Sequence, residues 1–157
     1  MELIIDFPGG SRVDAHFGAF TVPTDQPPEA SAPAPFALFL ASIGTCAGIY
    51  VLGFCRQRGL PTSGIRIVQR VHGGPGGMVD RIALEIELPA GFPEKYRDAV
   101  IRSAEQCAVK KHLEHPPVIV VTTRLAPSVP TTPAVPATPA VPATPAGTQV
   151  PAGAARS

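Results

Sequence analysis

Three cysteines are the residues of this chain best suited to chemistry. Cys46 lies within an apolar stretch, Cys55 ends that stretch, and Cys107 lies in SAEQCAVKKHL. A thiolate is a nucleophile toward peroxides and disulfides, and two neighbouring thiols can be oxidised to one disulfide. The cysteine number is odd, without a framework spacing, and residues 1–6 lack the features of a secretory signal. These observations predict reduced, cytoplasmic thiols rather than structural bridges.

Helical spacing separates two of the three cysteines. Cys46 and Cys55 are nine positions apart in an expected helix, which at about 100° per residue places them on opposite sides. The side that carries Cys55 also carries a stripe of small residues: Ala37, Ala41, Gly44 and Gly48. We expect Cys55 to fill space as a small apolar residue, and the stripe to permit close approach of another backbone.

The surroundings of Cys107 favour reactivity. We expect this cysteine at the start of a short helix, where backbone amides and the following Lys110 and Lys111 favour the thiolate over the thiol. Cys46 and Cys107 are each on a helical element, so they could meet as an attacking and a resolving thiol. The local patterns leave open whether they meet.

The elements that must position these thiols are of mixed type. The predicted helices are a long one over 36–58, which Gly59 and Pro61 end, and a second one that begins at Pro93. The predicted strands, recognised by their alternating apolar residues, cover 2–7, 12–22, a region from 65 to 71, 82–88 and 118–121. The sequence therefore predicts an α+β domain with antiparallel sheets and a long, buried central helix.

The stretch from Phe36 to Cys55 has no charged side chain, and its length would also suit a membrane span. Amphipathic strands on both sides need a common soluble sheet, so we favour a buried helix and expect no membrane. A helix that is apolar nearly all round needs cover on every side. One domain of this size leaves an apolar patch, so we predict an obligate homodimer with Cys46 near the interface edge.

Composition divides the chain in two. The formal net charge is +1 and the basic residues form no stripe, so we expect no nucleic acid partner. From Pro127 to Pro145 a proline falls at every third position, which is typical of an extended, solvated polyproline II segment. We predict a folded domain over 1–126 and a disordered tail over 127–157.

Two other kinds of site are weaker hypotheses. Cys46, Cys107, His112 and His115 could be counted as metal ligands, but their spacing matches no common zinc pattern. The glycine-rich segment 73–77 lies between two strands rather than before a helix, as a phosphate-binding loop would. We therefore expect no metal and no cofactor.

The two cysteine contexts together resemble a known family. The chain is similar to the OsmC/Ohr superfamily of osmotically inducible and organic hydroperoxide resistance proteins. The similarity lies in PFALFLASIGTCAGIYVLGFCRQRGLP, which is followed by a strand hairpin, a helix and SAEQCAVKKHL. The similarity covers about residues 1–125. It implies an interlocked α+β homodimer with active sites at the subunit interface. It also implies that Cys46 is the peroxidatic and Cys107 the resolving cysteine, with Arg12 as the arginine beside them.

The function that this resemblance implies is reduction of a hydroperoxide, in oxidative stress defence, with a dithiol reductant restoring the cysteines. One position departs from the family pattern. The peroxidases carry a glutamate near the start of the central helix, where this chain has Phe36 and Ala37, and Glu29 is the only nearby carboxylate. The alternative is a non-catalytic member of the fold that binds a small molecule or a thiol carrier at the dimer-interface pocket.

Overall fold

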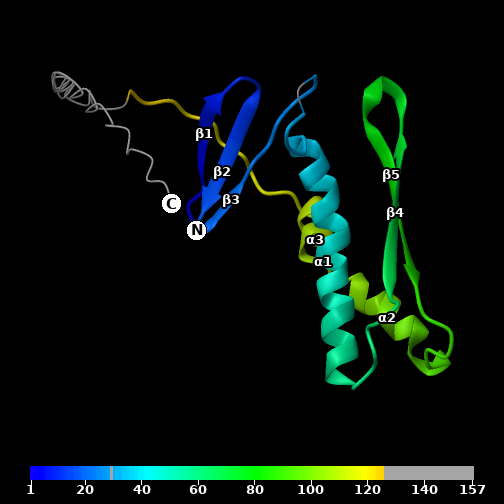
Figure 1. The fold of residues 1–157 in the computed structure, drawn as a ribbon. Helices are drawn as coiled ribbons and strands as arrows, with labels where there is room; N and C mark the ends of the chain where they lie inside the picture. The colour runs from blue at the N-terminus through cyan, green and yellow to red at the C-terminus, as the bar shows by residue number, and fades with distance from the viewer. Residues whose placement is uncertain (29, 126–157) are drawn as a thin grey trace, which may run out of the picture. The chain divides into compact units, whose positions relative to one another are not determined.

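The computed structural model describes residues 1–28 and 30–125 of the chain, as an α+β structure with two antiparallel sheets (Figure 1). Residues Met1–Ile119 form one compact unit, and residues 120–125 are the described part of a second unit. The mixed class and the antiparallel sheets predicted from the sequence are confirmed. The predicted tail over 127–157 lies outside the described residues.

The first sheet has three strands in chain order: β1 (Ile4–Gly9), β2 (Arg12–Phe17) and β3 (Phe20–Val22). The prediction of one strand over 12–22 is wrong, because the chain turns back at Gly18. This glycine has φ of +56°, a left-handed conformation that side-chain-bearing residues rarely adopt. The turn converts the expected single strand into the antiparallel pair β2–β3.

Helix α1 (Pro35–Gln57) is the long helix expected from the uncharged stretch, within one residue at each end. It begins at a proline, whose fixed φ suits the first helical position. It ends before Gly59, which adopts φ of +64° and accommodates the change of chain direction. The predicted stop signal of this helix is confirmed.

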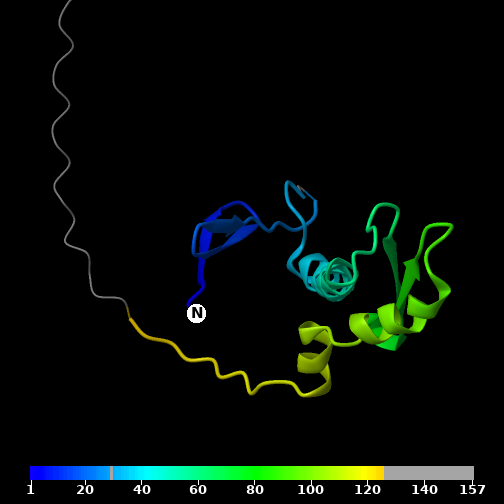
Figure 2. The ribbon, with the colours of Figure 1, turned by 90° about the horizontal axis from the view of Figure 1, so that it is seen from below.

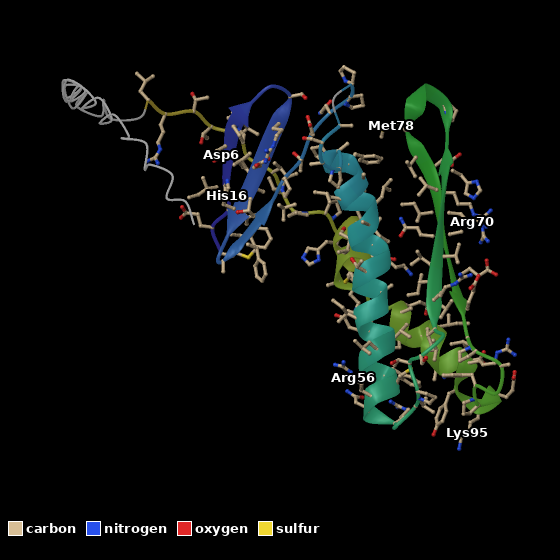
Figure 3. The ribbon with its side chains drawn as sticks, in the orientation of Figure 1. Asp6, His16, Arg56, Arg70, Met78 and Lys95 are labelled. Carbon is tan, nitrogen blue, oxygen red and sulfur yellow. The ribbon has the colours of Figure 1, made fainter. Side chains whose placement is uncertain are left out.

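The second sheet is the hairpin of β4 (Arg66–Gly73) and β5 (Val79–Glu87), joined by a loop with the short 3₁₀ helix η1 (Pro75–Gly77). In this register Ile67 pairs with Ile86 and Gln69 with Leu84, so one face of the hairpin is largely apolar. The other face carries the ion pairs Arg66–Glu87 and Arg70–Glu85. Arg70, on this charged face, points away from α1 (Figure 3). The predicted half-buried strand pair is confirmed.

Two short helices pack against α1. The 3₁₀ helix η2 (Glu94–Tyr96) leads into α2 (Arg97–Ala104), and α3 (Ala108–Glu114) follows after a tight turn. Helices α2 and α3 both contact α1, as Figures 1 and 2 show. The core lies where Val51 and Cys55 of α1 meet Val100 of α2, surrounded by apolar side chains of β4, β5 and the loops.

The segment 118–121 is not a strand, which corrects the prediction made from its four β-branched residues. Val118, Ile119, Val120 and Val121 are all exposed, at 77–90% of their surface, and no strand of the described chain pairs with them. A strand requires hydrogen bonds to a neighbouring strand, and a favourable local sequence does not supply that neighbour.

Helix α1 is the one helix among the described residues that is long and apolar enough to cross a membrane. Length and composition also fit the core helix of a soluble protein. In this structure Ile43, Ala47, Val51 and Cys55 form a buried face on α1, and α1 packs against α2, α3 and β4. This packing buries one face of α1, which supports the buried helix in part, whereas Ile49 and Tyr50 on the same helix are exposed.

Candidate active site

The structure brings Cys46 and Cys107 together. Cys46 lies in the middle of α1 and Cys107 directly precedes α3, and these two helices pack against each other. The thiol of Cys107 lies close enough to the Cys46 sulfur for each group to shift the pKa of the other. All three cysteines carry free thiols. The meeting that the sequence left open therefore occurs within one chain.

Local backbone geometry explains the position of Cys107. After α2 ends at Ala104, the N–H of Gln106 donates to Ser103 and the N–H of Cys107 donates to Ala104, so the chain turns sharply. Cys107 then caps α3, because its sulfur accepts the N–H of Lys110 at 3.5 Å. The expectation that Cys107 stands at the start of a short helix is confirmed.

Cys107 is also tied to α1. Its thiol lies 3.8 Å from the carbonyl oxygen of Ile43, one turn before Cys46 on the same helix. The Cys107 side chain is almost fully buried, whereas Cys46 is partly exposed. The pair thus has one sheltered sulfur and one that solvent reaches.

The two thiols differ in acidity. Burial by itself would raise the pKa of Cys46, but the nearby N–H groups of Val109 and Ala108 and the thiol of Cys107 favour its charged form. Together they outweigh burial and lower the pKa of Cys46 below its ordinary value. Burial raises the pKa of Cys107, and the neighbouring Cys46 sulfur raises it further. Cys46 is therefore the more acidic thiol of the pair, and Cys107 keeps its proton to higher pH.

Cys55 takes no part in this arrangement. Its side chain is completely buried in the core with Val51 and Val100, and burial raises the pKa of its thiol. A buried thiol with a raised pKa is a poor nucleophile. The space-filling role expected from its helical spacing is confirmed.

A cavity of about 470 Å³ adjoins Cys107. Its walls are mainly apolar and include Ile82, Leu84 and Ile86 of β5, with Glu105 and Lys110 as the charged residues. A cavity of this volume and lining is suited to a small, largely apolar molecule.

Arg12 is not brought to Cys46 within the described part of the chain. It is the first residue of β2 and forms an ion pair with Asp14, two residues further along the same strand. Sequence reasoning missed Asp14, although strand alternation places residues two apart on one face. Glu29, the other carboxylate considered from the sequence, lies outside the described residues.

Sequence reasoning also missed the backbone donors to Cys46. The N–H groups of Ala108 and Val109 lower the pKa of a cysteine that is more than sixty residues earlier in the chain. No side-chain pattern encodes such a contact, because every residue except proline carries an N–H group.

A metal centre gains no support from the described residues, which contain no cluster of three or more potential protein ligands. The Nδ1 atom of His112 lies 2.7 Å from the carbonyl oxygen of Ala108, within the same helix. This places His112 in a local contact with the backbone of α3.

Comparison of the sequence with known protein families identifies the family of this chain. A model of the OsmC-like protein family matches residues 28–122, which is more than half of the chain. The chain belongs to the OsmC-like family. This confirms the resemblance inferred from the two cysteine contexts.

Solved structures agree with this fold. One is a Psychrobacter arcticus protein described as an osmotic stress induced and detoxification response protein. It is 18% identical, has a TM-score of 0.57, and the match covers 69% of this chain and 85% of that chain. An OsmC-like protein from Mycoplasma pneumoniae is 13% identical with a TM-score of 0.61, over 72% and 86% of the two chains. None of the curated proteins matches the sequence.

Proposed function

We propose that this protein is a thiol-dependent peroxidase that reduces a hydroperoxide through Cys46 and Cys107. The observation that carries the proposal is the proximity of a partly exposed thiol of lowered pKa, Cys46, to a second, buried thiol, Cys107. Membership of the OsmC-like family supports it. The name of the Psychrobacter relative, a detoxification response protein, is consistent with it.

In the first step, the Cys46 thiolate attacks one peroxide oxygen. An S–O bond forms, the O–O bond breaks, and the alkoxide leaves as an alcohol after taking a proton. In the second step, the sulfur of Cys107 attacks the Cys46 sulfenic acid, so that a disulfide forms and water leaves. A dithiol reductant then returns two electrons and two protons to the pair by thiol–disulfide exchange.

The site is completed, in this proposal, by a second copy of the chain. A homodimer is supported by apolar surface that one chain leaves open: Ile49 of α1 is 67% exposed, and no strand among the described residues pairs with the segment 118–121. Exposed apolar surface is typical of sites where another protein chain binds. From the family resemblance, Arg12 is proposed as the cation beside Cys46 in this dimer.

The cytoplasm is the compartment that suits this proposal. A cysteine pair that must cycle between thiol and disulfide needs a reducing environment.

A decisive experiment counts free thiols after reaction with one equivalent of cumene hydroperoxide or hydrogen peroxide per chain. The wild-type protein should lose two thiols and keep one. Cys46→Ser should lose none, because the nucleophile is absent, and a matched Cys55→Ala variant should still lose two. Thiol loss by Cys46→Ser at the wild-type rate would refute the proposal.

A second candidate function rests on the cavity beside Cys107. If the wild-type protein keeps all three thiols, the 470 Å³ apolar space favours a non-catalytic protein that binds a small molecule or a thiol carrier. The same experiment therefore separates the two functions.

A further inference from the structure

In the ion pair between Arg12 and Asp14, the aspartate is buried and the arginine is partly exposed. The Asp14 side chain is only 6% exposed, whereas 43% of the Arg12 side chain remains accessible. A buried carboxylate is costly unless it is paired. Asp14 meets this need through a contact with one terminal nitrogen of Arg12 and a weaker one, at 3.4 Å, from the N–H of Thr24.

The backbone on both sides of Arg12 is held in place. The hydroxyl of Ser11 donates to Asp25 at 2.5 Å. The N–H of Val13 donates to the carbonyl of Thr24 at 3.1 Å, and the Thr24 hydroxyl donates back to the carbonyl of Val13. The arginine therefore projects from a fixed stretch of β2.

Asp25, which anchors this stretch, is itself fixed. It accepts hydrogen bonds from the N–H of Gln26 at 2.7 Å and from the N–H and hydroxyl of Ser31 at 2.8 and 2.6 Å. These donors, together with the Ser11 hydroxyl, hold the pKa of Asp25 well below its usual range. A charged, multiply bonded Asp25 links the β1–β2 turn to the loop that precedes α1.

A guanidinium held at one nitrogen keeps further N–H donors for another partner. Arginine carries five N–H groups in a planar fork, and one contact with a carboxylate leaves most of them free. The Arg12 side chain is 43% exposed, which leaves room for a second partner beside Asp14. The arrangement is suited to a second anion, such as a thiolate or a peroxide anion.

We propose that Asp14 is a positioning residue for Arg12: a carboxylate from the arginine's own strand that holds the guanidinium with its free N–H groups directed at an anion. At the start of α1, Phe36 and Ala37 supply no carboxylate for this purpose. The inference rests on the proposed function, in which the anion is the Cys46 thiolate or the peroxide bound to it.

The alkylation of Cys46 by two reagents tests this proposal without any peroxidase activity. Iodoacetate is an anion and iodoacetamide is neutral, and both react with the same thiolate. The ratio of their rates at Cys46, measured by peptide mass spectrometry on the full chain, therefore reports a cation held nearby. Arg12→Gln should lower this ratio by about threefold or more.

Asp14→Asn gives the decisive result, because it changes the iodoacetate-to-iodoacetamide rate ratio in opposite directions under two explanations. If Asp14 acts only through its negative charge, its loss would raise the ratio. If Asp14 positions Arg12, its loss would lower the ratio. We expect a decrease close to that of Arg12→Gln, and no further decrease in the double variant. Glu85→Gln, which breaks the exposed Arg70–Glu85 pair on the other sheet, should leave the ratio unchanged.

An unchanged or raised ratio in Asp14→Asn would overturn the positioning role. The role would also be overturned if Asp14→Asn lowered the ratio as much in the Arg12→Gln protein as in the wild-type protein. Asp14→Glu, which keeps the charge but moves the carboxylate by one methylene, provides a second variant if Asp14→Asn does not fold. It should also lower the ratio. If the wild-type protein ignores hydroperoxides while the ratio falls as expected, the peroxidase proposal fails and the positioning role stands.

Discussion

At the scale of single residues, the Cys46 thiol is distinguished by its surroundings. Two backbone N–H groups at the start of α3 and the Cys107 thiol lie near it and favour its charged form, and together they outweigh the effect of burial on its pKa. Burial, and then the neighbouring Cys46 sulfur, raise the pKa of Cys107. One sulfur is thereby prepared to attack and the other keeps its proton until the disulfide forms.

We predict that oxidation joins Cys46 to Cys107 and leaves Cys55 free. The thiols of Cys46 and Cys107 lie close enough to shift each other's pKa, whereas Cys55 is enclosed in the core with Val51 and Val100. Peptide mapping of the oxidised protein under non-reducing conditions would identify the bridge. A disulfide that includes Cys55, or a bridge between two chains, would contradict this assignment.

The pH dependence of alkylation follows from the same shifts. Since the pKa of Cys46 is lowered from its ordinary value, its thiolate forms at lower pH in the folded protein than in the unfolded chain. The rate of Cys46 alkylation by iodoacetamide should therefore reach half its maximum at a lower pH in the folded protein than in the urea-unfolded chain. Cys55 should react far more slowly in the folded protein, because burial raises its pKa. A folded-state midpoint at or above that of the unfolded chain would contradict the lowered pKa of Cys46.

At the scale of elements, the glycines of α1 set how closely β4 approaches. A Cβ added at Gly44 would lie 2.8 Å from Oε1 of Gln69, whereas one at Gly48 would lie 3.7 Å from Ile67. The Gln69 side chain also donates to the carbonyl of Leu40 at 2.9 Å. The small-residue stripe expected to face another backbone therefore contacts β4 side chains of the same chain.

Alanine substitutions at these two glycines should differ in their effect on stability. Gly48→Ala meets only an ordinary contact and gains helix propensity, so it should raise the free energy of unfolding by up to about 1 kcal/mol. Gly44→Ala gains the same propensity but must displace the Gln69 amide and its hydrogen bond to Leu40. Denaturant unfolding should show Gly44→Ala to be less stable than Gly48→Ala by about 1 kcal/mol. Equal stabilities would show that Gln69 yields without cost.

At the scale of the whole molecule, the notable feature is apolar surface that the chain does not cover. Ile49 on α1 and the four residues of 118–121 are exposed, and both sheets end in unpaired edge strands. Exposed edges and extended apolar segments tend to pair with another chain. A two-fold homodimer is the commonest closed arrangement that would cover them.

Sedimentation equilibrium should find a dimer at micromolar concentration without detergent. Ile49→Asp should weaken the dimer, because it places a charge on apolar surface that the second chain covers. Met78→Asp is the matched control, since Met78 is also exposed but lies at the tip of the β4–β5 hairpin (Figure 3). A monomeric wild-type protein would refute the dimer, and partition into membranes would point to a spanning role for α1.

The sequence by itself determined the elements whose signals are local. Pro35 and Gly59 act through their own backbone preferences, so the limits of α1 follow from residues near its ends. Alternation of apolar residues determined β4 and β5, because a half-buried strand needs only that pattern. Helical spacing likewise determined the core role of Cys55.

Only the tertiary structure decided which distant groups meet. The contact of Cys46 with Cys107, and with the amides of Ala108 and Val109, depends on the packing of α3 against α1. The state of the segment 118–121 likewise depends on a partner, and no strand among the described residues pairs with it. Local sequence patterns indicate which secondary structure each segment favours. The pKa values and the strand pairing depend instead on residues that folding brings together from distant parts of the sequence.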